Sequence, residues 1–182
     1  MNWNELKDKH FKWACENGQH DTELPCEHWL MLIITEAAEC IQADRNNKHT
    51  DVAVCKNGDE PFDPIWFERH IKDTVEDELA DVILRILDYC GLKQVDLSNL
   101  DQLVYIYLDI YNPTCHTQSL TSLCFLICRL LTSIDLVCTS QIPMSLIACM
   151  RYCKIHEIDI MWHIEQKMKY NQTRPHLNGK RY

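Results

Sequence analysis

Two pairs of acidic residues lie in apolar stretches of the sequence, where carboxylates are unusual. The stretch LMLIITEAAEC contains Glu36 and Glu39, three residues apart. The stretch EDELADVILRILD contains Glu78 and Asp81 at the same spacing. Residues i and i+3 lie on one face of a helix, about one turn apart. If the two helices pack antiparallel, all four carboxylates converge, and their burial is costly unless the charges are neutralised.

Shared protons or hard divalent cations can relieve the repulsion in such a cluster. Ligand sets made only of oxygen favour Mg²⁺, with Mn²⁺ as a substitute, over Ca²⁺ for catalysis. A ferritin-like di-iron site is disfavoured because it needs Glu-x-x-His pairs, and none of the nine His follows a Glu at that spacing. The alternative is that both pairs lie on solvated helix faces, as is common for Glu-rich helices. Their apolar flanks favour the shared site.

The C-terminal segment KMKYNQTRPHLNGKRY concentrates basic residues in a chain that is acidic overall. Lys167 and Asn171 are four residues apart and share a helix face, and Arg174 follows within about one turn. Together with Lys180, these side chains are candidates to bind phosphate oxygens, Arg through a bidentate fork and Lys as a point charge. A basic C-terminus can instead complement the helix dipole and remain in solvent.

Helices must position these residues, and the hydrophobic periodicity predicts several. They are expected at residues 2–17, 25–45, 65–91, 98–112 and 116–138, with one long or broken helix from residue 143 to about 170. Gly18 and Gly91 are the expected helix stops. The polar segment 46–64, which is closed by two prolines, is expected to be a loop. The two carboxylate pairs therefore fall on the second and third helices.

Composition indicates a globular, all-α protein of a single domain. The 182 residues are 46% hydrophobic and 25% charged, and only four are Gly, which argues against a turn-rich all-β fold. The net charge of −9 excludes non-specific binding to a nucleic acid polymer or an anionic membrane, because both need a basic surface. The first residues have no signal-peptide pattern, so a cytoplasmic protein is expected.

The eleven Cys are expected to be free thiols that pack in the core, because nothing in the sequence indicates secretion. Two pairs, Cys124 with Cys128 and Cys149 with Cys153, are spaced to share a helix face. A metal site at these pairs is the alternative to core packing. Core packing is favoured because the chain has neither a C-x-x-C motif nor a Cys/His zinc pattern.

Three blocks of the sequence together resemble the motifs of a known family. ITEAAECIQA, VEDELADVILRILDYCG and KMKYNQTRPHLNGKRY are similar to the motifs of the MazG-like, all-α nucleoside triphosphate pyrophosphohydrolases, whose wider superfamily includes dimeric dUTPases and dCTP pyrophosphatases. The paired E-x-x-E and E-x-x-D motifs and the closing K-x-x-x-N-x-x-R-P pattern carry the resemblance. It implies a helical bundle with a carboxylate-lined metal site, formed by residues 1–182 as one domain.

The resemblance also implies an activity. Members of the family hydrolyse a nucleoside triphosphate between its α and β phosphates, which yields the monophosphate and pyrophosphate and serves nucleotide-pool sanitation. It implies Mg²⁺ ligation by Glu36, Glu39, Glu78 and Asp81, and phosphate binding by Lys167, Asn171 and Arg174. Glu36 or Glu39 is then the candidate general base. Because family members assemble as dimers or tetramers, a homodimer or homotetramer is expected.

Two features depart from the family pattern. The interval from Glu39 to Glu78 is long, so residues 46–64 resemble an insertion. Lys48, His49 and Lys56 of this insertion either cover the substrate or lie in an inert surface loop, and the inert loop is favoured. Residues 92–150 add helices that the smallest members lack, and these are expected to build the core or a dimer interface.

Base recognition is the least determined part of the predicted site. His28 and Trp29 precede Glu36 on the same helix and are the candidates for one wall of a base pocket. Other Trp residues either stack on a base or pack in the core, and core packing is the commoner role. The alternative to an enzyme is a catalytically silent helical protein that binds nucleotides or partners and keeps a structural ion cluster. The presence of all four carboxylates together with the basic tail favours the enzyme.

Overall fold

The computed structural model describes residues 2–51, 62–110, 119–133 and 141–179. Within these residues the chain forms eight α-helices and no β-strand, which confirms the predicted all-α class. The helices are α1 (Trp3–Glu16), α2 (Cys26–Arg45), α4 (Pro64–His70), α5 (Val75–Leu92), α6 (Leu100–Ile110), α7 (Leu120–Thr132), α8 (Gln141–Ile155) and α9 (Ile160–Gln172), and a 3₁₀ helix η1 (His176–Gly179) follows. None of them is both long enough and apolar enough to cross a membrane.

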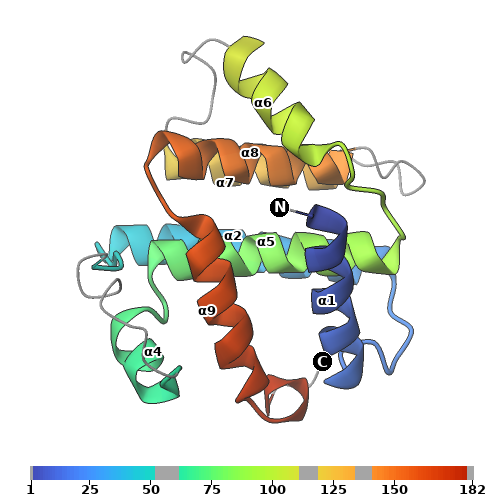
Figure 1. Ribbon diagram of the computed structural model, residues 1–182, viewed down its shortest axis with the longest axis vertical. Helices are drawn as coiled ribbons and strands as arrows, with labels where there is room; N and C mark the ends of the chain where they lie inside the picture. Colours follow the sequence, from blue (N-terminus) through green and yellow to red (C-terminus); the bar gives the residue numbers. More distant parts are fainter. Residues whose placement is uncertain (1, 52–61, 111–118, 134–140, 180–182) are drawn as a thin grey trace.

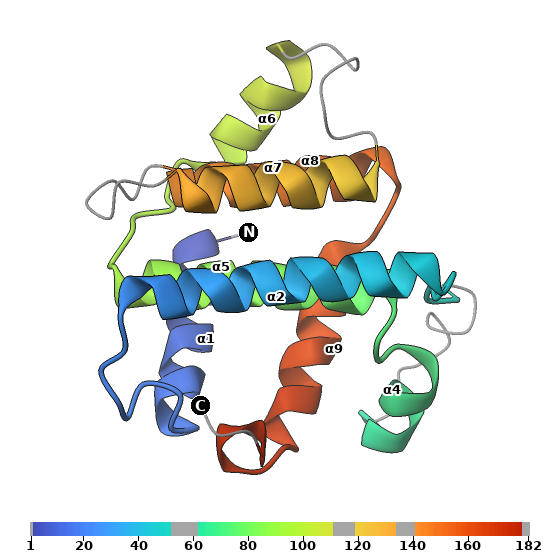
Figure 2. The ribbon, with the colours of Figure 1, turned by 180° about the vertical axis from the view of Figure 1, so that it is seen from behind.

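The centre of the fold is the pair formed by α2 and α5, which lie side by side and run antiparallel (Figures 1 and 2). Ile33 of α2 and Leu79, Ile83 and Ile86 of α5 are fully buried. These apolar residues recur every three or four positions along α5, so one face of the helix is apolar. The antiparallel pairing that the two carboxylate pairs require is therefore present.

The other helices cover this pair on two sides (Figures 1 and 2). α7 and α8 form a second pair that runs along α2 and α5, and α6 lies over α7 and α8. Leu123, Ile127 and Ile142 are fully buried in this second layer, so the described parts of residues 92–150 contribute to the core. On the opposite side α1 and α9 cross α5, and α4 packs beside α9.

The prediction of one continuous helix over residues 65–91 is wrong, because the chain breaks it into α4 and α5. Asp73 has a φ of 62°, which Asp tolerates better than most residues and which cannot continue a helix. Thr74 is the N-cap of α5, and its Oγ1 accepts a hydrogen bond from the backbone N–H of Asp77 at 3.3 Å. The C-terminal helix is also broken, between α8 and α9, where Glu157 has a φ of 55°.

Gly91 allows α1 to approach α5 closely. A Cβ at this position would lie 2.5 Å from Cγ of Phe11, well inside van der Waals contact. Gly91 is inside α5 and does not terminate it, since the helix continues to Leu92. The expected stop at Gly91 is therefore displaced by one residue, and the glycine is needed for packing.

We predict that Gly91→Ala lowers the free energy of unfolding by about 1–3 kcal/mol, the usual cost of overpacking a core. In an unobstructed helix the same change stabilises by up to about 1 kcal/mol. The matched control is therefore the same substitution in a Phe11→Ala background, where the change is expected to be neutral or stabilising. Chemical denaturation of the four proteins in this cycle measures both values. An equal effect of Gly91→Ala in the two backgrounds would contradict the close contact.

Candidate functional site

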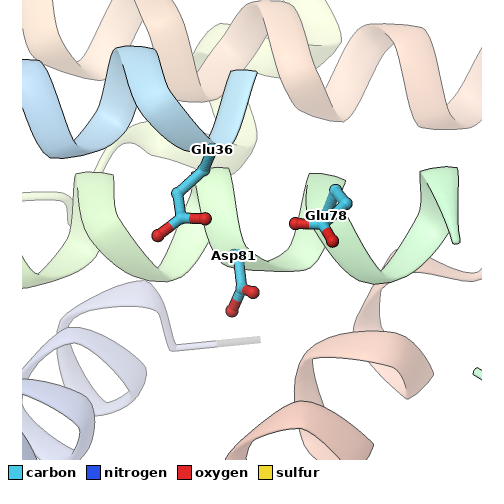
Figure 3. Close-up of side chains that lie close together, drawn as sticks. All are labelled: Glu36, Glu78 and Asp81. Carbon is cyan, nitrogen blue, oxygen red and sulfur yellow. The ribbon is translucent and has the colours of Figure 1, made fainter. Parts of the chain in front are cut away.

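Three carboxylates meet between α2 and α5 (Figure 3). Glu36 extends from α2, and Glu78 and Asp81 extend from α5. One oxygen of each lies within 4.8 Å of the others. Two oxygens bound to one Mg²⁺ at the usual 2.0–2.1 Å lie about 3 Å apart when adjacent and about 4 Å apart when opposite. A small contraction of the group would bring all three oxygens to one ion.

The turn before α5 sets the position of the first-turn acids. Asp77 lies in the first turn of α5, and its Oδ2 accepts a hydrogen bond from the backbone N–H of Asp73, in the turn before the helix, at 3.1 Å. Glu78 also belongs to the first turn of α5, where the partial positive charge of the helix N-terminus stabilises anions. The break at residues 71–74 thus places acidic side chains where the backbone favours them.

The three carboxylates line a cavity of about 200 Å³. The same cavity is lined by Glu39 of α2, by Lys167 and Asn171 of α9, and by Arg174 just beyond α9. Seven of the residues predicted from the sequence therefore lie around one space. Glu39 is exposed and is not part of the three-carboxylate group, so it lies on the solvent side of the cavity.

Two basic side chains already neutralise part of the cluster. The ammonium of Lys167 lies 2.8 Å from Oδ2 of Asp77 and 2.6 Å from Oδ2 of Asp81, and only 6% of its side chain is exposed. Arg85 donates from Nε to Oε1 of Glu36 at 3.1 Å. One acid of α2 (Glu36) and two acids of α5 (Asp77 and Asp81) are therefore bound to a cation of the protein.

Burial and the charge of Asp81 shift Glu78 and Glu36 toward their protonated forms. Burial, followed by the charge of Asp81, raises the pKa of Glu78 from 4.5 to about 8. The same two causes raise the pKa of Glu36, although Arg85 opposes the shift. Burial alone would lower the pKa of Lys167, but the adjacent Asp81 and Asp77 outweigh it and raise that pKa. At neutral pH the carboxyl of Glu78 is thus predominantly protonated.

Several buried polar atoms around the cavity have no hydrogen-bond partner among the described residues. They include Oε2 of Glu78, Oδ1 of Asp77 and Oδ1 of Asn171. Buried polar atoms in folded proteins are nearly always paired with protein, water or ions. A group of three carboxylates that includes such an oxygen fits a hard divalent cation. Among the described residues it is also the one set of at least three His, Cys, Asp or Glu that is close enough to share an ion.

The two residues predicted to form a base pocket lie beside the main cavity. His28 and Trp29 line a smaller cavity of about 10 Å³, which shares Gln19, Arg85 and Asn178 with the main one. Trp29 is buried and its ring stacks on His20, with centroids 4.4 Å apart. The ring of Trp29 is therefore occupied by a protein partner. Trp13 lines the main cavity, whereas Trp66 and Trp162 pack with α4 and α9.

The other predicted features lie away from the cavity or outside the described residues. Lys180 and Lys56 are outside the described part of the chain. His49 binds Oε1 of Glu76 through Nδ1 at 3.0 Å, and neither it nor Lys48 lines the cavity. The eight described Cys are free thiols, and five of them are buried. No described Cys takes part in a group able to hold a metal.

Sequence reasoning missed several polar residues of the site, among them Arg85, Gln19 and Lys72. Arg85 lies four residues after Asp81, on the same face of α5. Its charge inside the apolar run LADVILRIL was a signal that could have identified it. Gln19 and Lys72 carried no such signal, because each belongs to a short connection between helices. Only the folded chain brings them to the cavity.

A comparison of the chain with known protein families, with curated proteins and with solved structures finds no match. The assignment of a function therefore depends on the residues of the site and on their geometry.

We predict that the ion-free protein loses stability as the pH rises toward the pKa of Glu78. Because the folded-state pKa of about 8 exceeds the unfolded value of 4.5, folding takes up a proton between these two values, so the stabilising contribution of this proton is full below about pH 4.5, falls as the pH rises and is gone above about pH 8. The difference in unfolding free energy between the wild type and Glu78→Gln should therefore change between about pH 5 and pH 8 and level off above about pH 8. Denaturation in the presence of a chelator measures it.

The matched control for this titration is Glu165→Gln, which alters an exposed acid on α9. Its unfolding free energy should follow that of the wild type across the whole pH range. If Glu78→Gln also runs parallel to the wild type, Glu78 is ionised in the ion-free fold and the assignment of a buried proton is wrong.

We predict that Lys167→Met destabilises the protein by about 3–5 kcal/mol, because it leaves Asp77 and Asp81 without their buried counter-ion. Adding Asp77→Asn should recover part of the loss, since one of the unpaired charges is then removed. Lys169→Met is the control: Lys169 makes an exposed pair with Glu165 at 2.8 Å, and such pairs contribute at most about 1 kcal/mol. Equal losses for the two lysines would refute the buried pairing.

Proposed function

We propose that this chain is a Mg²⁺-dependent hydrolase that cleaves a nucleoside triphosphate to the monophosphate and pyrophosphate. One observation carries the proposal: the three-carboxylate group and the basic residues at the end of α9 line the same cavity. A polyphosphate needs both kinds of group, because divalent cations must bridge it to an acidic protein and basic side chains must contact the oxygens that the cations leave uncovered. The sequence resemblance to the MazG-like pyrophosphohydrolases supports the same reaction.

The carboxylates have separate roles in this proposal. Glu36, Glu78 and Asp81 would hold Mg²⁺, and Oε2 of Glu78, which has no described partner, would be free to bind it. Bound Mg²⁺ supplies charge neutralisation for the polyphosphate and lowers the pKa of a coordinated water. Glu39, at the solvent side of the same cavity, accepts the proton of the attacking water as general base.

The basic and amide groups orient the substrate. Asn171 is buried at the cavity, and its Oδ1, which lacks a described partner, can accept a hydrogen bond from an ordered water or another donor, whereas its Nδ2 is the group that can donate to a phosphate oxygen. Arg174 is held by a hydrogen bond of 3.3 Å from Nη2 to the carbonyl oxygen of Asn178 and by the face of Tyr170, 5.9 Å from its guanidinium carbon. The guanidinium of Arg174 is therefore fixed before a phosphate arrives, which reduces the entropy lost on binding.

The alternative function is a silent helical protein that binds nucleotides or partners without hydrolysis. Its support is that Arg85 and Lys167 already compensate two of the three carboxylates, so the cluster is tolerable in a purely structural role. The two functions differ in whether a monophosphate forms.

We predict that the purified chain releases pyrophosphate from at least one member of a panel of standard and modified nucleoside triphosphates, and only when Mg²⁺ or Mn²⁺ is present. Glu39→Ala should reduce the rate by about 10²–10⁴-fold, as expected for loss of a general base. Glu78→Gln should raise the Mg²⁺ concentration required, because it removes a ligand. Glu165→Gln serves as the surface control. Monophosphate and pyrophosphate are quantified together, so that sequential loss of single phosphates is recognised.

The outcome of this panel separates the candidates. Binding of Mg²⁺ and nucleotide by a folded protein without any turnover would favour the silent binding protein. Turnover that is equal in the wild type and in Glu39→Ala would remove Glu39 from the mechanism. Turnover without added metal in the presence of a chelator would contradict a metal-dependent reaction.

A further inference from the structure

Arg85 is a cation of the site that the proposed reaction has not yet used. It lies on α5, one turn beyond Asp81, and lines both the main cavity and the smaller one beside it. Only 20% of its side chain is exposed. An arginine rarely takes such a position unless it is paired, so its hydrogen bonds indicate its role.

A guanidinium has five N–H donors, and those of Arg85 are only partly used. Nε donates to Oε1 of Glu36 at 3.1 Å, and Nη1 donates to Oε1 of Gln19 at 3.0 Å. In the described part of the chain the remaining donors have no recorded partner. Because Arg cannot lose its proton in a protein, the side chain remains a cation with donors available to an anion.

The one carboxylate that Arg85 binds is also a candidate metal ligand. Glu36 belongs to the three-carboxylate group, so a divalent cation there would take over the negative charge that Arg85 now compensates. The guanidinium would then need another anion close to the same place. Lys72, Lys167 and Arg174 also line this cavity, so other cations lie around the same space as the carboxylates.

We propose, on the basis of the proposed function, that Arg85 exchanges partners during the reaction cycle. In the ion-free protein it neutralises Glu36. When Mg²⁺ and a polyphosphate enter, Glu36 binds the cation and Arg85 binds phosphate oxygens of the substrate and of the pyrophosphate product. Gln19 keeps the guanidinium in place during the exchange, since its contact to Nη1 involves neither the cation nor the substrate. Arg85 is thus a phosphate-binding residue on the central helix pair, additional to those at the C-terminal end of the chain.

The alternative is that Arg85 is only a clamp between α2, α5 and the connection that contains Gln19. The two roles make opposite predictions for the metal. Without Arg85, Glu36 has no competing counter-ion, so Mg²⁺ alone should bind more tightly if the partner exchange occurs. If Arg85 only holds these segments together, its removal would let the three carboxylates move apart and would weaken Mg²⁺ binding instead.

The experiment measures two affinities by calorimetry on the full chain: Mg²⁺ alone, and inorganic pyrophosphate in excess Mg²⁺. We predict that Arg85→Gln binds Mg²⁺ more tightly than the wild type and binds Mg²⁺-pyrophosphate about 10-fold to 100-fold more weakly, the range for loss of a hydrogen bond to a charged group. Arg85→Lys, which keeps the charge without the fork, should fall between them. Arg69→Gln, an exposed arginine of α4, is the control and should match the wild type.

The results that overturn the inference are distinct from those that overturn the function. If Arg85→Gln and Arg85→Lys both bind Mg²⁺-pyrophosphate as the wild type does, Arg85 does not contact phosphate. If both variants lose Mg²⁺ and pyrophosphate affinity in the same proportion, Arg85 is only a clamp. If the wild type binds Mg²⁺ but no pyrophosphate and no nucleotide, the proposed function itself fails.

Discussion

The fold depends on the compensation of carboxylates that are buried between two helices. Glu36, Asp77 and Glu78 are each less than a tenth exposed, and Asp81 lies among them. Without compensation, so many anions in one interface would force α2 and α5 apart. Three features reduce this repulsion: Arg85 binds Glu36, Lys167 bridges Asp77 and Asp81, and Glu78 retains a proton. With the acids compensated in these three ways, the apolar faces of α2 and α5 pack against each other.

The pairing of Lys167 with the buried acids also constrains where α9 and α4 pack. Lys167 belongs to α9, which is far from α5 in the sequence. Its ammonium reaches the acids of α5 only because α9 packs across the central helix pair (Figure 1). α4 supports that docking from the other side. Phe67 is fully buried, stacks on Tyr170 with centroids 4.5 Å apart, and places its ring 5.8 Å from the ammonium of Lys167. An aromatic contact thus holds the cation that the carboxylates need.

The sequence predicts the acids of the site better than the geometry around them. Spacing and apolar flanks were sufficient for Glu36, Glu78 and Asp81, because helical periodicity is a local property. The break before α5 was missed, since a run of helix-forming residues conceals a single Asp with positive φ, and Thr74 can cap a helix as well as continue one. The pairing of Lys167 with Asp77 could not be foreseen, because it joins residues 90 positions apart and depends on the crossing of α9 and α5.

The same compensation affects how a cation can enter. An ion that arrives alone must displace the proton of Glu78 and the guanidinium of Arg85, and it leaves that guanidinium without a counter-ion. An ion that arrives bound to a polyphosphate brings the replacement anion with it, so the displaced Arg85 and the other cations that line the cavity gain a partner in the same step. Under the proposed function, metal and substrate therefore bind with positive coupling, and each raises the affinity of the site for the other by the same factor. A site that keeps its own cations on its ligands in the resting state is suited to bind the complex in preference to either component alone.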